Sequence, residues 1–156
     1  MNRFAARTDA QAVVRAGRDE IWAALTDPAL VARMTPFVKS IEADGEHWLW
    51  EMTSLEVLGV GVASAFTERM TFTDLERIEF RHDPPTGKQE RTGVHGWYDL
   101  TDTDGGTHLA TSLEVSVELP LPRLSAPAVR TTMKGVMATM GQRFSHNLLD
   151  HLGVAR

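Results

Sequence analysis

Glu68, His82 and Tyr98 are the side chains whose types and positions could carry acid–base chemistry in this 156-residue sequence. Each lies in a segment where apolar and polar residues alternate, and each shares the apolar parity of its segment. Glu68 falls between Phe66 and Met70, so burial of that side would desolvate its carboxylate. An acid, an imidazole and a phenol in one apolar cavity could orient a hydroxyl or carbonyl group of a ligand, or move protons in a cyclisation or dehydration.

These residues also have structural interpretations. A one-residue bulge would turn Glu68 outward, or Glu68 would pair with Arg69 and Arg81 at the rim of a sheet. His82 stands beside Asp83 at the end of its segment, where a histidine is often only a turn residue. The sequence leaves the structural and the chemical interpretation open.

The remaining candidate motifs do not have the spacing that a metal site, a nucleotide site or a serine hydrolase requires. His146 and His151 are five residues apart, whereas two ligands on one helix face need a spacing of about three or four, so we expect no metal site. The sequence contains neither a phosphate-binding glycine loop nor a Gly-x-Ser-x-Gly motif. We therefore expect no cofactor, and neither nucleotide nor serine-hydrolase chemistry.

The composition limits the classes of partner. The chain carries 21 acidic and 16 basic residues, and its net charge of -5 gives no general attraction to nucleic acid or anionic lipid. It contains no cysteine, which excludes disulfides and thiolate chemistry. No apolar run approaches the ~20 residues of a membrane span, and the N-terminal segment lacks the pattern of a signal peptide. We expect a cytoplasmic protein that binds no nucleic acid and does not insert into membranes.

Hydrophobic periodicity predicts the elements that position the candidate residues. Residues Arg7 to Ala16 alternate as in a first strand, and two short helices follow, one in RDEIWAALTDP and one from Pro28 to Arg33. Turn-prone segments separate most of six further strands, which favours antiparallel hairpins. These strands are expected near Val38–Ala43, His47–Val57, Val60–Thr73, Arg77–His82, Thr92–Thr101 and His108–Leu119. No linker or repeat divides the chain, so we predict one domain over residues 1–156.

Pro127 begins a long C-terminal helix whose apolar side chains form one stripe about 100° wide. The stripe consists of Val129, Met133, Met137, Met140, Phe144 and Leu148. A twisted antiparallel sheet has one face to cover, and this helix is the only predicted element long enough to cover it. The methionines are therefore predicted to face the sheet.

The methionine stripe indicates either an ordinary packed core or an adaptable pocket. Methionine is flexible and polarizable, so it fits changing contents better than the branched residues of a fixed core. Gly135 and Gly141 each cost the helix about 1 kcal/mol relative to alanine, which would suit a thin or mobile wall. With the inward-facing strand residues, the predicted ligand contacts are Trp48, Trp50, Phe66, Met70, Phe80, Met133, Met137, Met140 and Phe144.

Two segments resemble a known superfamily. AVVRAGRDEIWAALTDPALVARMTPFVKSIE (residues 12–42) is similar to the start of START-like proteins, also called the SRPBCC or polyketide cyclase/dehydrase and lipid-transport group, and YDLTDTDGGTHLATSLEV (residues 98–115) resembles the penultimate hairpin of that group. The resemblance implies an α+β helix-grip fold. In that fold a seven-stranded curved antiparallel sheet wraps around a long C-terminal helix, with two short helices between strands 1 and 2. It also implies an internal pocket for apolar molecules.

Three functions follow as hypotheses. The leading one is binding or transport of a small hydrophobic, lipid- or polyketide-like ligand in a cavity between the sheet and the C-terminal helix. The alternative is a cofactor-independent cyclase, aromatase or dehydrase that uses Glu68, His82 or Tyr98 as acid and base. The third is a partner-binding domain with a filled core. An exposed sheet edge would also allow a homodimer.

Overall fold

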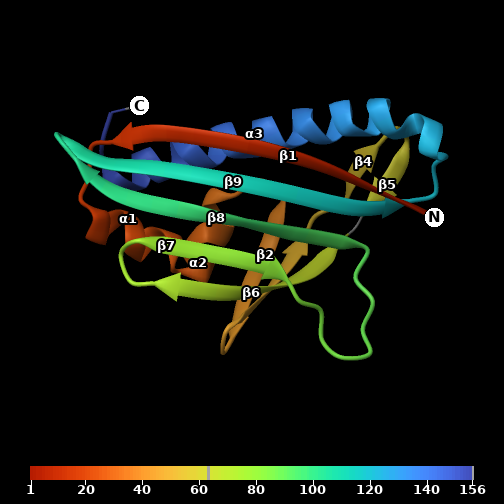
Figure 1. Ribbon diagram of the computed structural model, residues 1–156, viewed down its shortest axis with the longest axis horizontal. Coiled ribbons are helices and arrows are strands. Elements are labelled where there is room, and N and C mark those ends of the chain that lie inside the picture. Colours follow the sequence, from red (N-terminus) through yellow and green to blue (C-terminus); the bar gives the residue numbers. More distant parts are fainter. Residues whose placement is uncertain (63, 156) are drawn as a thin grey trace.

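Helix α3 (Ala126–Leu152) lies along the inner face of a curved, seven-stranded antiparallel sheet in the computed structural model (Figure 1). The structure describes residues 1–62 and 64–155. Across the sheet the strands follow the order β1-β9-β8-β7-β6-β3-β2. Their bounds are β1 Asn2–Val14, β2 Val38–Asp44, β3 His47–Met52, β6 Ala65–Thr73, β7 Arg77–His82, β8 Thr92–Thr103 and β9 Gly106–Leu119. The predicted α+β helix-grip architecture is confirmed.

Strand β1 begins at Asn2 rather than at the predicted Arg7, because its pairing with β9 extends from Asn2 opposite Leu119 to Val14 opposite Thr107. The early residues of β1 belong to the core: Phe4 is 3% exposed. Burial alternates at Phe4 and Ala6 and returns at Val14, whereas residues 9–13, where the sequence alternates most clearly, are all exposed.

The predicted strands 47–57 and 60–73 are each wrong as single strands. A separate two-stranded sheet forms from β4 (Leu55–Val57) and β5 (Val60–Val62). β3 stops at Met52, and Thr53 donates from both its backbone N–H and its hydroxyl to the Phe37 carbonyl. Leu58 and Gly59 then both have positive φ, at 50° and 81°, as a two-residue hairpin turn with right-handed strand twist requires. The hairpin packs beside the start of α3 (Figure 1).

Two short helices, α1 (Arg18–Leu25) and α2 (Pro28–Met34), lie between β1 and β2 as predicted. The Asp27 side chain caps α2 by accepting a hydrogen bond from the Leu30 backbone N–H at 3.2 Å, and Pro28 occupies the first helical position. Asn147 of α3 donates to the Met34 carbonyl at 2.8 Å, which satisfies an unpaired group at the end of α2. The two helices therefore anchor the C-terminal part of α3.

The α3 stripe faces the sheet, as predicted. Val129, Met133, Met137 and Leu148 are all buried. Gly135 and Gly141 are both exposed to solvent. Because a Cβ added at either glycine would point into open space, these glycines do not thin the wall of a pocket, and the mobile wall stays a prediction. No helix among the described residues is long and apolar enough to cross a membrane.

Replacing Gly135 or Gly141 by alanine is expected to stabilise the protein. A Cβ added at either position meets no other atom within 4 Å, and alanine favours a helix interior by about 1 kcal/mol over glycine. Each variant should raise Tm by roughly 2–4 °C in a circular-dichroism melt. Gly96→Ala is the control and should lower Tm, because its Cβ would collide with the Ser112 carbonyl oxygen and the Phe80 ring. A lower Tm in both helix variants would contradict the assignment of these glycines to the open side.

Candidate functional site

Glu68 lies near the middle of β6 on the face turned toward α3. Its neighbours across the sheet are Trp48 on β3 and His82 on β7, and only 2% of its surface is exposed. The next residue, Arg69, points the other way and forms an ion pair with Glu46 at 3.1 Å. Glu68 is therefore a buried carboxyl group on the inner face and not part of an exposed rim pair.

Burial raises the pKa of Glu68 to about 8, because the charged carboxylate would lose its hydration among apolar side chains. The indole N–H of Trp50 opposes this shift in part by favouring the charged form. Its Nε1 atom is buried, and within the part of the chain that the structure describes it has no acceptor at hydrogen-bonding geometry. At neutral pH Glu68 is thus mainly a protonated acid that can donate and accept, next to an indole donor that is not fully used.

Tyr98 of β8 shares this face with Glu68. It lies opposite Thr111 of β9, and its ring contacts Phe80 at 6.0 Å between centroids. Burial raises the pKa of Tyr98 to about 12, and the negative charge that Glu68 can carry raises it further, while a hydrogen bond with Thr111 acts in the opposite direction. Two of the three candidate acid–base residues thus share the inner face as neutral hydrogen-bonding groups, and the charge that Glu68 can carry acts on Tyr98.

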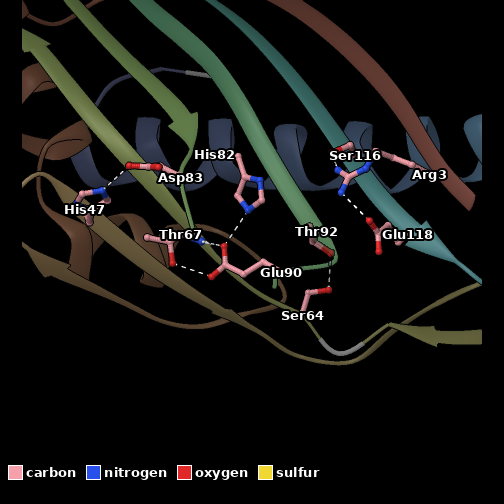
Figure 2. Close-up of polar contacts among 10 residues, drawn as sticks. All are labelled: Arg3, His47, Ser64, Thr67, His82, Asp83, Glu90, Thr92, Ser116 and Glu118. Carbon is pink, nitrogen blue, oxygen red and sulfur yellow. Dashed lines mark hydrogen bonds and ion pairs between the residues drawn. The ribbon is translucent and has the colours of Figure 1, made fainter. Parts of the chain in front are cut away.

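His82, the third candidate, interacts with a different residue. Its Nε2 atom lies 2.9 Å from Oε1 of Glu90, and its ring packs closely over Gly93. Figure 2 shows the Glu90 carboxylate between His82 and Thr67. Among the described contacts, no hydrogen bond or ion pair joins His82 to Glu68. His82 therefore lies at the end of β7, which agrees with its structural interpretation as a strand-end residue.

Sequence analysis missed Glu90. This side chain comes from the loop after β7, yet the residue is only 6% exposed. Its two oxygens accept from the backbone N–H and the hydroxyl of Thr67, both at 2.8 Å. The carboxylate supplies an acceptor where β7 leaves the sheet, so the Thr67 N–H is not left unpaired. Glu90 stands in the polar run TGKQER, and nothing in the periodicity of that run indicates burial.

The nine predicted ligand contacts divide into two groups. Trp48, Phe66, Met70, Phe80, Met133 and Met137 are core residues, none more than 8% exposed. Trp50, Met140 and Phe144 keep more accessible surface. Trp50 nevertheless stacks on Phe66, with ring centroids 5.6 Å apart and planes 16° from parallel. Only the second group has surface that another molecule could contact without displacing the core.

Side chains of the inner face are buried at both ends of α3, while some of those on β8 and β9 in between are packed on the main core cluster but keep accessible surface. One buried cluster joins Val117 and Leu119 of β9 to Met133 of α3, and another joins Leu148 to α1 and α2. Between them, several side chains on β8 and β9 face α3 and yet are only partly buried: Tyr98, Leu109, Thr111, Leu113 and Val115. Met140, which lies between the two clusters along α3, belongs to neither. Accessible surface on the inner face therefore lies along β8 and β9, beside Tyr98.

A surface depression of about 580 Å³ lies elsewhere, beside the start of α1. Ion pairs cross its lining, from Arg18 to Asp102 at 2.9 Å and from Arg77 to Asp99 at 2.6 Å. A second depression, of about 440 Å³, lies between α2 and β2. Neither is lined by a predicted ligand-binding residue. They are separate from the inner-face site.

The raised pKa of Glu68 predicts a characteristic dependence of stability on pH. Between the ordinary value of 4.5 and about 8 the folded protein binds more protons than the unfolded chain, so this contribution to stability is present at low pH and is lost as pH rises. Relative to Glu68→Gln, the wild type should lose on the order of 3 kcal/mol of unfolding free energy between pH 5 and pH 8. Urea unfolding at both pH values measures this difference.

The exposed Glu51→Gln variant on β3 is the matched control and should show no such change. A stability difference between wild type and Glu68→Gln that stays constant from pH 5 to pH 8 would mean that the carboxyl group titrates alike in the folded and unfolded states.

Comparison with solved structures supports the fold. A conserved protein from Geobacillus kaustophilus is 16% identical with a TM-score of 0.73, covering 94% of this chain and 95% of that one. The Zhui aromatase/cyclase from Streptomyces sp. R1128 is 13% identical with a TM-score of 0.68, covering 96% and 94%. A START superfamily protein from Mycobacterium smegmatis is 13% identical with a TM-score of 0.66, covering 94% and 97%. At these identities the likeness concerns the fold alone.

A search of curated proteins gives no match. The family model described as polyketide cyclase/dehydrase and lipid transport matches residues 5–152, nearly the whole chain. This match and the START-like neighbours confirm the resemblance that residues 12–42 and 98–115 indicated. The chain belongs to the polyketide cyclase/dehydrase and lipid transport family.

Proposed function

We propose that the protein binds a small hydrophobic molecule between the sheet and α3. The observation that carries this proposal is the accessible surface that inward-facing side chains of β8, β9 and α3 retain in the middle of the inner face. In a filled core, residues such as Leu113 and Val115 on a central strand would be as buried as Val117. The accessible surface is mainly apolar, which suits an apolar ligand.

The surrounding elements support this role. The β4–β5 hairpin and the start of α3 close one end of the inner face, while α1 and α2 close the other (Figure 1). Met140 and Phe144 lie over the middle of the inner face, and a methionine can adapt to contents of different shape. The family description includes lipid transport, which agrees with a carrier. As expected from the sequence, we propose a single cytoplasmic domain that needs no cofactor.

Filling the middle of the inner face tests the carrier. Met140→Trp should reduce binding of an apolar fluorescent dye by at least about tenfold, because the larger ring would occupy the space of the ligand. Thr139→Trp, one residue away on the exposed side of α3, is the matched control and should bind dye as the wild type does. Thermal melts of both variants verify folding.

Native mass spectrometry of freshly purified protein should in addition show a retained small molecule. A clean apo mass together with no dye uptake by the wild type would refute the carrier proposal. That result would favour the third hypothesis, a partner-binding domain with a filled core.

A cofactor-independent cyclase or dehydrase is the second candidate function. It is favoured by Glu68 and Tyr98, two inner-face groups that can donate and accept protons and that influence each other electrostatically. One structural neighbour is described as an aromatase/cyclase, which is said of that protein and supports the idea only through the shared fold. His82 is the weaker candidate for an acid–base role here, because Glu90 occupies its Nε2 atom.

The enzyme alternative predicts a separation of turnover from binding. With a linear poly-β-carbonyl model substrate, Glu68→Gln should abolish turnover, because the amide cannot transfer a proton, while dye binding remains intact. Tyr98→Phe should lower turnover in the same assay. Product formation is followed by liquid chromatography with mass detection. Turnover in Glu68→Gln equal to the wild type would count against catalysis by this carboxyl group.

A further inference from the structure

We infer that this site selects an uncharged apolar molecule that carries a carbonyl or hydroxyl oxygen, bound beside Trp50 and Glu68, and that it rejects carboxylate-bearing molecules such as fatty-acid anions. The inference rests on the proposed function, since it assumes that the ligand lies between the sheet and α3. It adds the chemistry of the polar end of the ligand, which the apolar lining alone does not define.

The first argument is the lack of a cation on the inner face as described. The ionisable groups that face Glu68 from neighbouring elements are Tyr98 on β8 and His82 on β7, and His82 is already paired with Glu90. The inward-facing residues of β3 and β9 and the stripe of α3 carry no ionisable side chain. A ligand carboxylate would therefore lose its hydration without gaining a counter-charge.

The basic residues of the sheet lie on its outer side, engaged elsewhere. Arg69 pairs with Glu46, and Arg77 binds both Glu79 and Asp99 while stacking over the Trp97 ring. On α3 the basic residues are all exposed. No described lysine or arginine is placed to meet an anion in the middle of the inner face.

The second argument is the supply of hydrogen-bond donors. The buried Trp50 N–H has no acceptor at hydrogen-bonding geometry among the described residues, and an indole nitrogen can only donate. Glu68 holds a proton at neutral pH, whereas the phenol of Tyr98 already has Thr111 as a hydrogen-bond partner. A ligand carbonyl or hydroxyl oxygen would satisfy these donors, whereas a pure hydrocarbon would leave the Trp50 N–H unpaired.

Other polar groups near this surface are already satisfied. Thr111 donates to the Trp97 carbonyl at 2.9 Å, and the hydroxyl groups of Ser64 and Thr92 bind each other at 2.7 Å. The unsatisfied donor capacity is therefore concentrated at Trp50 and the adjacent Glu68. One oxygen atom on an apolar body matches this arrangement.

Three ligands with the same ring system test the inference: naphthalene, 2-acetylnaphthalene and 2-naphthoate. At pH 7, titrations followed by protein fluorescence should show 2-acetylnaphthalene binding at least about tenfold more tightly than either of the others. Trp50→Phe keeps a ring but removes the donor, so it should reduce the preference for 2-acetylnaphthalene over naphthalene. Glu51→Gln, on the outer side of β3, should leave all three affinities unchanged.

The pH dependence provides an independent readout. 2-Acetylnaphthalene does not ionise, so any loss of its affinity in the wild type between pH 6 and pH 9.5 reports on the protein. We expect such a loss as Glu68 ionises and ceases to donate, whereas Glu68→Gln should bind this ketone almost equally across the range. A profile that is identical in wild type and Glu68→Gln would overturn the role of Glu68.

The outcomes separate this inference from the proposed function. If either 2-naphthoate or naphthalene binds as tightly as 2-acetylnaphthalene, the proposed selectivity is refuted, but the proposed carrier function is not. If the dye binds and none of the three naphthalenes does, the selectivity is again refuted. If neither dye nor any naphthalene binds the wild type, the proposed site itself is wrong.

Discussion

The burial of the α3 stripe against the inner face of the sheet is the interaction on which the rest of the structure depends. Val129 and Met133 pack on β1 and β9 at one end, and Leu148 packs on α1 and α2 at the other. An antiparallel sheet of this curvature has one face to cover, and α3 covers it along its length (Figure 1). Since the two ends fix the helix, the middle need not be filled to hold it in place.

The same covering helix determines the electrostatics of the site. Glu68 would be an ordinary carboxylate on a solvated sheet, but α3 removes it from water, and its pKa rises to about 8. Tyr98 shares this environment and remains a phenol. Both groups are then hydrogen-bond donors at neutral pH, which suits recognition of a neutral oxygen or proton transfer to it. The carrier and the enzyme therefore use one arrangement, and they differ only in whether a proton moves.

Glu90 shows how the functional interpretation of His82 depends on a residue of the following loop. Its carboxylate ends the β6–β7 pairing at Thr67 and also binds the imidazole of His82 (Figure 2). His82 lies opposite Glu68 in the sheet register, yet its hydrogen bond is directed to Glu90. Parity along a strand places a side chain on a face, but it does not identify the partner of that side chain.

The sequence by itself determined the element order, the antiparallel pairing, the orientation of the α3 stripe and the inward parity of Glu68 and Tyr98. These follow from local periodicity and turn residues, which act over a few positions. Only the tertiary structure decided that Gly135 and Gly141 face solvent, that the segment around Leu58 forms a separate hairpin, and that Glu90 is buried. Each depends on contacts between distant segments, because rotation of a helix, interruption of a strand and burial of a loop carboxylate are set by what packs against them.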